Sequence, residues 1–157
     1  EDLTDANFVA FNASECIGYG LLDGGASRSV GGVDQLEAIQ DALLETGKDV
    51  TVDSQAQLGF SFAGGDRADA RARVALQVDS LDQNPVSIYV LDRPSPILLG
   101  VDMLKRYGLV IDYMSDKVYS HVLGRELETK VLASGHLVLN LMPALSEPGN
   151  SGSPSLR

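Results

Sequence analysis

The chain has 157 residues, 44% of them hydrophobic, and a formal net charge of −10. This length fits one domain with its own core, and the acidic charge argues against nucleic acid as a partner. No apolar run approaches the ~20 residues that cross a bilayer, and the start lacks a signal-peptide pattern, so no membrane role is expected. The single cysteine, Cys16, excludes an internal disulfide and fits a reducing compartment. We therefore expect an intracellular, cytoplasmic protein, and because the first residue is Glu1, a piece of a longer chain.

The first third of the chain predicts two strands, a glycine-rich turn and a helix. Short strands are expected at residues 8–11 and 16–22, and the second runs straight into Asp23-Gly24-Gly25. The two glycines permit a sharp turn there. From residue 33 to residue 43 the apolar positions follow helical spacing, and Gly47 is placed to end that helix.

The middle of the chain predicts strands. Period-two alternation over residues 58–62 and 72–78 indicates a hairpin, with the turn at Gly64-Gly65-Asp66. Another strand is expected at residues 86–91. The wholly apolar run at residues 97–99 is typical of a short buried strand.

The last third predicts a short helix, a hairpin and a final strand. The helix is expected near Gly100–Tyr107, the hairpin at residues 109–122 and the strand at residues 136–142. From residue 143 to residue 157, proline, glycine and serine indicate a flexible tail. We therefore expect a mostly β domain at residues 1–142, folded as a small barrel with two helices.

Several common catalytic motifs are absent from the sequence. It has no Gly-x-Ser-x-Gly elbow, no phosphate-binding loop and no cluster of cysteine and histidine at metal spacing, so no cofactor or metal is expected. Gly18-Tyr19-Gly20 is only half of a dinucleotide fingerprint. His121 and His136 are isolated and read as polar strand positions, and Cys16 reads as a small core residue. Carboxylates remain as the candidate catalysts.

Two segments resemble one enzyme family. Leu21-Leu22-Asp23-Gly24-Gly25-Ala26, at a strand end, resembles the active-site loop of retroviral and retrotransposon aspartic proteases, the retropepsin-like family. Pro96 to Leu104 resembles the apolar strand, glycine and short helix that support this loop in the family. Between them, residues 58–78 are similar to the flap hairpin. The two motifs occur in the expected order, and the resemblance covers roughly residues 8–122.

The resemblance implies a closed-barrel acid-protease fold, with one helix after the catalytic loop and one short helix near Gly100–Tyr107. It also implies a site without metal ligands. The residues of that site are catalytic Asp23; loop residues Leu22, Gly24, Gly25, Ala26 and Ser27; flap residues Phe60, Phe62, Ala63, Gly64 and Gly65; and support residues Leu98, Leu99, Gly100 and Asp102.

Peptide hydrolysis without a metal can use two close carboxylates that share one proton, one acting as base toward water and the other as acid. The chain has one such loop, so the resemblance implies a symmetric homodimer with Asp23 and its mate at the two-fold axis. The flap would close over an extended peptide or polyprotein substrate. Residues 137–141 are the candidate strand for a sheet between the two copies.

The loop departs from the family pattern at three positions. Gly24 stands where Ser or Thr usually braces the two loops, a loss on the order of 1 kcal/mol per subunit. Ser27 and Val101 stand where many retroviral members have an Asp–Arg pair. The Ser27 hydroxyl is a candidate cap of the turn, and Arg28 with Asp102 is a weaker candidate for a substitute pair. These differences favour a retrotransposon or domesticated origin.

Three hypotheses remain open. The first is an aspartic endopeptidase that processes a polyprotein as a homodimer. The second is a catalytically weakened or inactive descendant that binds peptides or dimerises, which the absent hydroxyl at Gly24 favours. The third is an unrelated β-barrel interaction domain in which Asp23 only ends a strand; Asp23 would then be exposed, with no helix from Gly100 to Leu104 packed beneath it.

Overall fold

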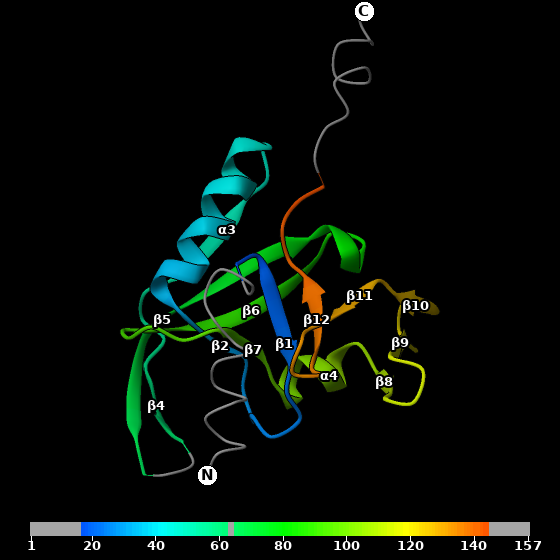
Figure 1. Cartoon of the computed structure of the whole chain (residues 1–157). Coiled ribbons are helices and arrows are strands. Elements are labelled where there is room, and N and C mark those ends of the chain that lie inside the picture. The colour runs from blue at the N-terminus through cyan, green and yellow to red at the C-terminus, as the bar shows by residue number, and fades with distance from the viewer. Residues whose placement is uncertain (1–16, 63–64, 145–157) are drawn as a thin grey trace, which may run out of the picture.

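A computed structural model describes residues 17–62 and 65–144 of the chain. The described part is mostly β, as the sequence predicts (Figure 1). Its elements in chain order are β1 (Tyr19–Leu22), β2 (Val30–Gly32), α3 (Val33–Glu45), β3 (Val50–Asp53), β4 (Leu58–Ser61), β5 (Arg67–Val78), the 3-10 turn η1 (Asp79–Leu81), β6 (Asn84–Leu91), β7 (Ile97–Leu99), α4 (Val101–Arg106), β8 (Leu109–Asp112), β9 (Lys117–Ser120), β10 (Arg125–Leu127), β11 (Thr129–Val131) and β12 (Leu137–Asn140).

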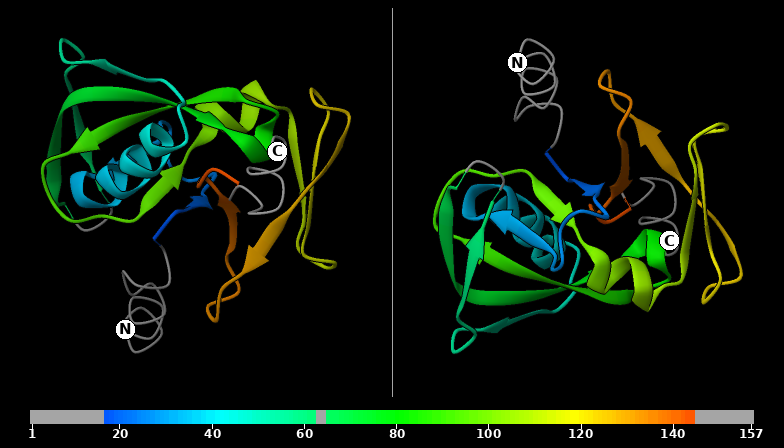
Figure 2. Two further views of the ribbon diagram at one scale, coloured as in Figure 1. Left: turned by 90° about the horizontal axis from the view of Figure 1, so that it is seen from above. Right: turned by 90° about the horizontal axis from the view of Figure 1, so that it is seen from below.

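The expected closed barrel is not present in the described residues. The main sheet has the order β11-β12-β1-β7-β2-β6-β5-β3, with β4 paired to β5, and β8, β9 and β10 form a second sheet. Closure would require the two edge strands to pair. However, β3 pairs only with β5, and β11 pairs only with β12. The main sheet is therefore open and curved (Figure 2).

An open sheet leaves part of the hydrophobic core uncovered. Helix α3 and the second sheet cover that part. The largest hydrophobic cluster joins residues of the main sheet to Leu36, Ile39 and Leu43 of α3, to Val118 of β9 and to Leu127 of β10. The three α3 residues recur at helical spacing and form one apolar stripe. Figures 1 and 2 show α3 against the curved sheet and the second sheet at the other end of the molecule. This arrangement explains why the core needs no closed barrel.

The two predicted helices are confirmed. Helix α3 runs two residues further than predicted, to Glu45. Gly47, at φ +79°, donates its N–H to the Leu44 carbonyl (3.1 Å), and the Lys48 N–H reaches the Leu43 carbonyl (3.0 Å). These two hydrogen bonds form a Schellman motif, so Gly47 ends the helix as predicted.

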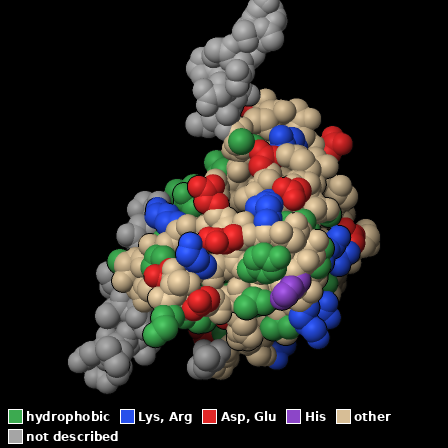
Figure 3. All heavy atoms as spheres, turned by 90° about the vertical axis from the view of Figure 1, so that its right-hand side faces the viewer, with side chains coloured by type: hydrophobic (Ala, Val, Ile, Leu, Met, Phe, Trp, Pro, Cys, Tyr) green, Lys and Arg blue, Asp and Glu red, His purple; other side chains and the backbone are tan. Residues whose placement is uncertain are grey.

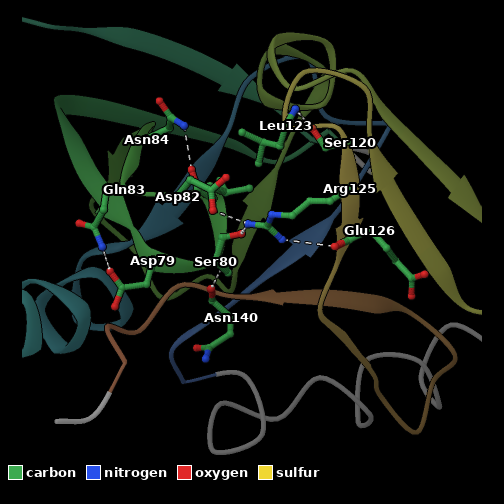
Figure 4. Close-up of polar contacts among 11 residues, drawn as sticks. Asp79, Ser80, Asp82, Gln83, Asn84, Ser120, Leu123, Arg125, Glu126 and Asn140 are labelled. Carbon is green, nitrogen blue, oxygen red and sulfur yellow. Dashed lines mark hydrogen bonds and ion pairs between the residues drawn. The ribbon is translucent and has the colours of Figure 1, made fainter. Parts of the chain in front are cut away.

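Side chains fasten the second sheet to the η1 turn (Figure 4) and to the end of α4. The Arg125 guanidinium donates to the Ser80 carbonyl (2.9 Å) and pairs with Asp82 (2.7 Å). The buried Ser120 hydroxyl donates to the Tyr107 carbonyl (2.7 Å) and accepts the Leu123 N–H (3.1 Å).

Hydrophobic, acidic and basic side chains are intermixed on the face that the second sheet presents (Figure 3).

The remaining strand predictions have mixed outcomes. The hairpin at residues 109–122 and the strands at residues 86–91 and 97–99 are confirmed, whereas β2, β3, β10 and β11 were not predicted. The strand expected at residues 8–11, Cys16, and residues 145–157 of the expected tail lie outside the described residues. Pro143 is buried, and the Ala144 N–H donates to Asp79.

The prediction that residues 137–141 supply a strand to an intermolecular sheet is wrong. Strand β12 lies between β1 and β11 and is hydrogen-bonded to both. Both of its edges are therefore occupied within the chain, and no edge is free to pair with a second copy. The edge strand beside it is β11.

Candidate active site

Asp23 lies directly after β1, in a loop fixed by backbone hydrogen bonds. Its N–H donates to the Leu99 carbonyl (2.9 Å), and its own carbonyl accepts the Ala26 N–H (3.2 Å). One carboxylate oxygen, Oδ1, accepts the Gly25 N–H (2.9 Å). The side chain remains partly exposed. The carboxylate is thus oriented by its own loop while staying accessible.

Strand β1 holds the start of this loop between two neighbours. It pairs in parallel with β7 and antiparallel with β12. Leu22 and Leu99 enter the main core, 5% and 0% exposed. Leu21 points to the opposite face, where it packs with Val138 and the half-buried Leu98. Because side chains alternate along a strand, Asp23 continues the row begun by Leu21 and lies outside the main core.

The first turn of α4 supports the loop from below. The Val101 N–H donates to the Ala26 carbonyl (2.7 Å). A Cβ added to Gly100 would lie 2.6 Å from the carbonyl oxygens of both Ala26 and Arg28, so this close approach requires glycine. The segment from Gly100 is therefore packed against the loop, which is the reverse of what the unrelated-barrel hypothesis expects.

Ser29 joins the loop to α4 and was not predicted from the sequence. Its N–H and hydroxyl donate to the two carboxylate oxygens of Asp102 (3.1 and 2.9 Å), and its hydroxyl accepts the Gly100 N–H (3.0 Å). Ser29 is 0% exposed. Asp102 therefore bonds to Ser29, and the suggested Arg28–Asp102 pair does not form. No local sequence signal identifies Ser29, because its partner Asp102 lies 73 positions further along the chain.

The prediction that the Ser27 hydroxyl caps the turn is wrong, as far as the described residues show. Ser27 is exposed, and its hydroxyl makes no hydrogen bond to that part of the chain. Ser29, two residues later, makes the side-chain bonds that hold this segment. Val101 is half-buried and contributes its N–H, not its side chain, to the support of the loop.

Gly24 and Gly25 are both exposed, but they have different surroundings. A Cβ on Gly24 would meet no atom within 4 Å, whereas a Cβ on Gly25 would lie 3.2 Å from Asp23 Oδ1. A side chain at position 24 therefore fits this chain. Its absence leaves the loop without the hydroxyl that the family resemblance leads one to expect.

A cleft of about 480 Å³ opens beside Asp23. One wall is the loop and the other is the end of β4 in the hairpin with β5. The lining residues are Asp23, Gly25, Ala26, Ser27, Arg28, Val30, Phe60, Ser61, Phe62 and Leu98. The structure thus brings Asp23 and the predicted flap residues Phe60 and Phe62 to one cavity, with Leu98 of the support segment in its wall.

Aromatic contacts hold the hairpin over this cleft. The Phe60 ring meets the Tyr89 ring edge-on, with centroids 5.7 Å apart, and the Arg93 guanidinium lies 5.1 Å from the centre of the Phe62 ring. The hairpin turns where the Phe62 N–H donates to the Asp66 carbonyl (2.8 Å), and Gly65 has φ +89°. Ala63 and Gly64, also predicted as flap residues, lie outside the described residues.

The two histidines lie elsewhere. The exposed His121 follows β9 and meets the Tyr119 ring edge-on, and His136 lies 2.7 Å from the Ser134 hydroxyl. Neither lines the cleft. Within residues 17–62 and 65–144 no three His, Cys, Asp or Glu side chains gather as a metal site would require, and no helix there is long and apolar enough to span a membrane.

No protein-family model matches the sequence, and no curated protein matches it significantly. The functional argument therefore depends on the geometry of the loop and the cleft.

Proposed function

We propose that this chain is an aspartic endopeptidase of the retropepsin-like type, active as a homodimer on extended segments of a polyprotein. The observation that carries the proposal is the position of Asp23. It stands at the end of β1, in a cleft, on a loop that Leu99, Gly100 and Val101 tether from below. A strand-end aspartate with such support is the arrangement that a carboxylate catalyst needs, because catalysis depends on fixed geometry.

The chemistry requires a second carboxylate. In the proposed dimer, Asp23 of each copy faces the other across the two-fold axis, and the pair shares one proton because two close carboxylates do not both ionise. The ionised carboxylate removes a proton from water, which attacks the scissile carbonyl carbon, while the protonated one donates to the carbonyl oxygen. Collapse of the tetrahedral intermediate breaks the C–N bond: the amine takes the proton that the first carboxylate removed from water, and a hydroxyl proton of the intermediate returns to the carboxylate that had donated one.

The exposed face of the loop is the proposed contact between the two copies. Gly24 and Gly25 are exposed and lack side chains, so another backbone can approach closely. A symmetric contact there would place the two Asp23 side chains together. The contact does not use β12, whose edges are occupied.

The substrate is proposed to lie extended along the cleft. Strand β4 pairs with β5 on one side and has no second strand partner in the described residues. Its free backbone groups are suited to pair with an extended peptide in β fashion. Val30, Phe60, Phe62 and Leu98 offer apolar contact to the peptide's side chains.

One observation favours a second candidate function, a peptide-binding or dimerisation module without catalysis. Gly24 provides no hydroxyl to brace the loops, and its surroundings are open. A loop that binds but does not catalyse does not need a rigid pair of carboxylates. The cleft and the free edge of β4 would serve such a module equally well.

A cleavage assay separates the two functions. The wild-type chain and Asp23→Asn are incubated with unstructured protein substrates between about pH 4 and pH 7, with and without a transition-state-mimicking aspartic protease inhibitor. Cleavage that the inhibitor blocks and the substitution abolishes supports the protease. A wild-type dimer that cleaves nothing supports the binding module, and cleavage that survives Asp23→Asn removes Asp23 from the mechanism.

A further inference from the structure

Arg28 is a basic residue in the lining of the proposed substrate cleft. It lines this cavity together with Asp23 and the apolar flap residues Phe60 and Phe62. The chain holds 22 acidic residues against 12 Lys and Arg, yet in the described ranges no carboxylate forms an ion pair with Arg28. The side chain is exposed. An exposed cation that lines a cleft and has no ion partner among the described residues is free to pair with a ligand.

The backbone that carries Arg28 is fixed. Before Arg28, the Ala26 carbonyl accepts the Val101 N–H (2.7 Å). After Arg28, Ser29 is fully buried and donates two hydrogen bonds to the Asp102 carboxylate. The Ser29 carbonyl also accepts the Tyr89 N–H (2.9 Å). Ser29 therefore faces inward while Arg28 faces the cleft. A guanidinium held on a fixed backbone loses less freedom when it binds than one on a loose loop.

We propose that Arg28 is a specificity residue that selects peptides with an acidic side chain at a fixed distance from the scissile bond. The inference rests on the proposed function. A guanidinium binds a carboxylate through two parallel hydrogen bonds, a geometry that an amide side chain of equal size does not match. The Arg93 guanidinium, stacked on Phe62 at the wall of the cleft, adds positive potential. The Asp23 carboxylate repels acidic groups, so the selected side chain lies on the Arg28 side of the cleft.

The apolar lining completes the substrate class. Val30 belongs to a buried cluster that includes Leu91, and the partly buried Phe60, Phe62 and Leu98 pack against it. Side chains that enter this part of the cleft meet carbon atoms and not water. The inferred substrate is an extended peptide with apolar residues at the scissile bond and one Glu or Asp a fixed number of residues away.

Matched peptides test the inference. In each pair, Glu or the isosteric Gln occupies one position, and the pairs move that position along a peptide with a central apolar–apolar bond. We expect a kcat/KM ratio of roughly three to ten in favour of Glu at one position, the range for a partly exposed charged pair. Arg28→Gln should bring the ratio to about one, and Arg28→Glu should favour peptides with Lys at that position. Arg71→Glu, the same charge change outside the cleft, should preserve the preference for Glu.

A binding measurement keeps this inference separate from the proposed function. Fluorescently labelled Glu and Gln peptides are titrated with Asp23→Asn protein, with and without Arg28→Gln. If the Glu peptide binds more tightly than the Gln peptide and the difference depends on Arg28, the inference is supported. This holds even if wild type cleaves no peptide, because absent cleavage counts only against the proposed protease activity. Equal binding and equal cleavage of Glu and Gln peptides at every position would overturn the inference and leave the protease intact.

Discussion

The surroundings of Gly24 decide what a side chain there would do. The position is open in one chain, since a Cβ would meet nothing within 4 Å. The neighbouring Gly25 donates its N–H to Asp23, and a Cβ on it would crowd the same carboxylate at 3.2 Å. These two adjacent, exposed glycines therefore differ in how well each tolerates a side chain.

Gly24→Ser should tighten the proposed dimer. The added hydroxyl fits the open space and supplies the bond that the family resemblance places across the two-fold axis. A gain of about 1 kcal/mol corresponds to roughly fivefold in the dimer dissociation constant, measured by sedimentation. Gly25→Ser is the matched control and should give no gain, because it crowds Asp23. An unchanged dissociation constant for Gly24→Ser would contradict this contact.

Ser29 should contribute more to stability than Ser27. Ser29→Ala leaves the buried Gly100 N–H without its acceptor and removes one donor to Asp102, a cost of about 1–3 kcal/mol. Ser27→Ala changes an exposed hydroxyl and should stay within about 0.5 kcal/mol. Denaturant unfolding of both variants measures the difference. Equal free energies of unfolding would show that the Ser29–Asp102 link does not hold the loop.

At the scale of elements, α4 and the loop share one contact that allows no side chain. Gly100→Ala would place a Cβ 2.6 Å from two carbonyl oxygens, so the helix must move away from the loop. We expect a loss of at least about 2 kcal/mol in the free energy of unfolding, together with loss of cleavage. Gly24 lies in the loop that Gly100 contacts, but in open space, so the free energy of unfolding of Gly24→Ala should stay close to that of wild type. A Gly100→Ala variant as stable as wild type would mean that α4 does not support the loop.

How much of these elements the sequence predicts depends on how local their causes are. The stripe Leu36, Ile39 and Leu43 and the terminating Gly47 are local signals, so helix α3 was predicted nearly in full. Strand β2 was missed because its glycines look like a turn. A Cβ on Gly31 would lie 2.8 Å from Ile97, and one on Gly32 would lie 2.6 Å from the Ser95 backbone nitrogen. Those glycines permit close strand packing, a cause that only the fold reveals.

The candidate site was predictable where it repeats a known pattern. Asp23, Phe60 and Phe62 line one cleft, and Gly100 packs against the loop that carries Asp23; the roles assigned to these residues stay predictions. The Ser29–Asp102 link joins residues 73 positions apart, so neither residue alone indicates it. The prediction that residues 137–141 pair with a second copy is wrong for the same reason, because the pairing of β12 with β1 and β11 is set by the whole sheet.

At the scale of the whole molecule, Asp79 connects three distant segments. Its carboxylate accepts hydrogen bonds from Gln83 and from the Ala144 N–H and lies 3.5 Å from the Lys48 ammonium. Burial raises the pKa of Asp79, but these hydrogen bonds and the Lys48 charge outweigh it, so the pKa lies below its ordinary value of 3.8. The folded chain therefore binds this proton less readily than the unfolded chain.

The sign of this shift predicts acid sensitivity. A lowered folded-state pKa contributes stability that is complete above the unfolded value, near pH 4, and is lost as the pH falls through the folded value. Asp79→Asn should flatten the fall in unfolding free energy below about pH 4, and Lys48→Met should flatten it in part. Denaturant unfolding across that range measures the slope. If the unfolding free energies of Asp79→Asn and wild type fall with the same slope below about pH 4, Asp79 is not a cause of the acid sensitivity.

The proposed enzyme exists only as a pair of chains, because each contributes one Asp23. The most direct test mixes wild-type chain with increasing Asp23→Asn chain at constant wild-type concentration and follows peptide cleavage. Mixed dimers have one carboxylate, so we predict that cleavage by wild type falls as Asp23→Asn is added and approaches zero at large excess. Cleavage that stays constant at every ratio, or an Asp23→Asn chain that cleaves alone, would contradict a shared pair of aspartates.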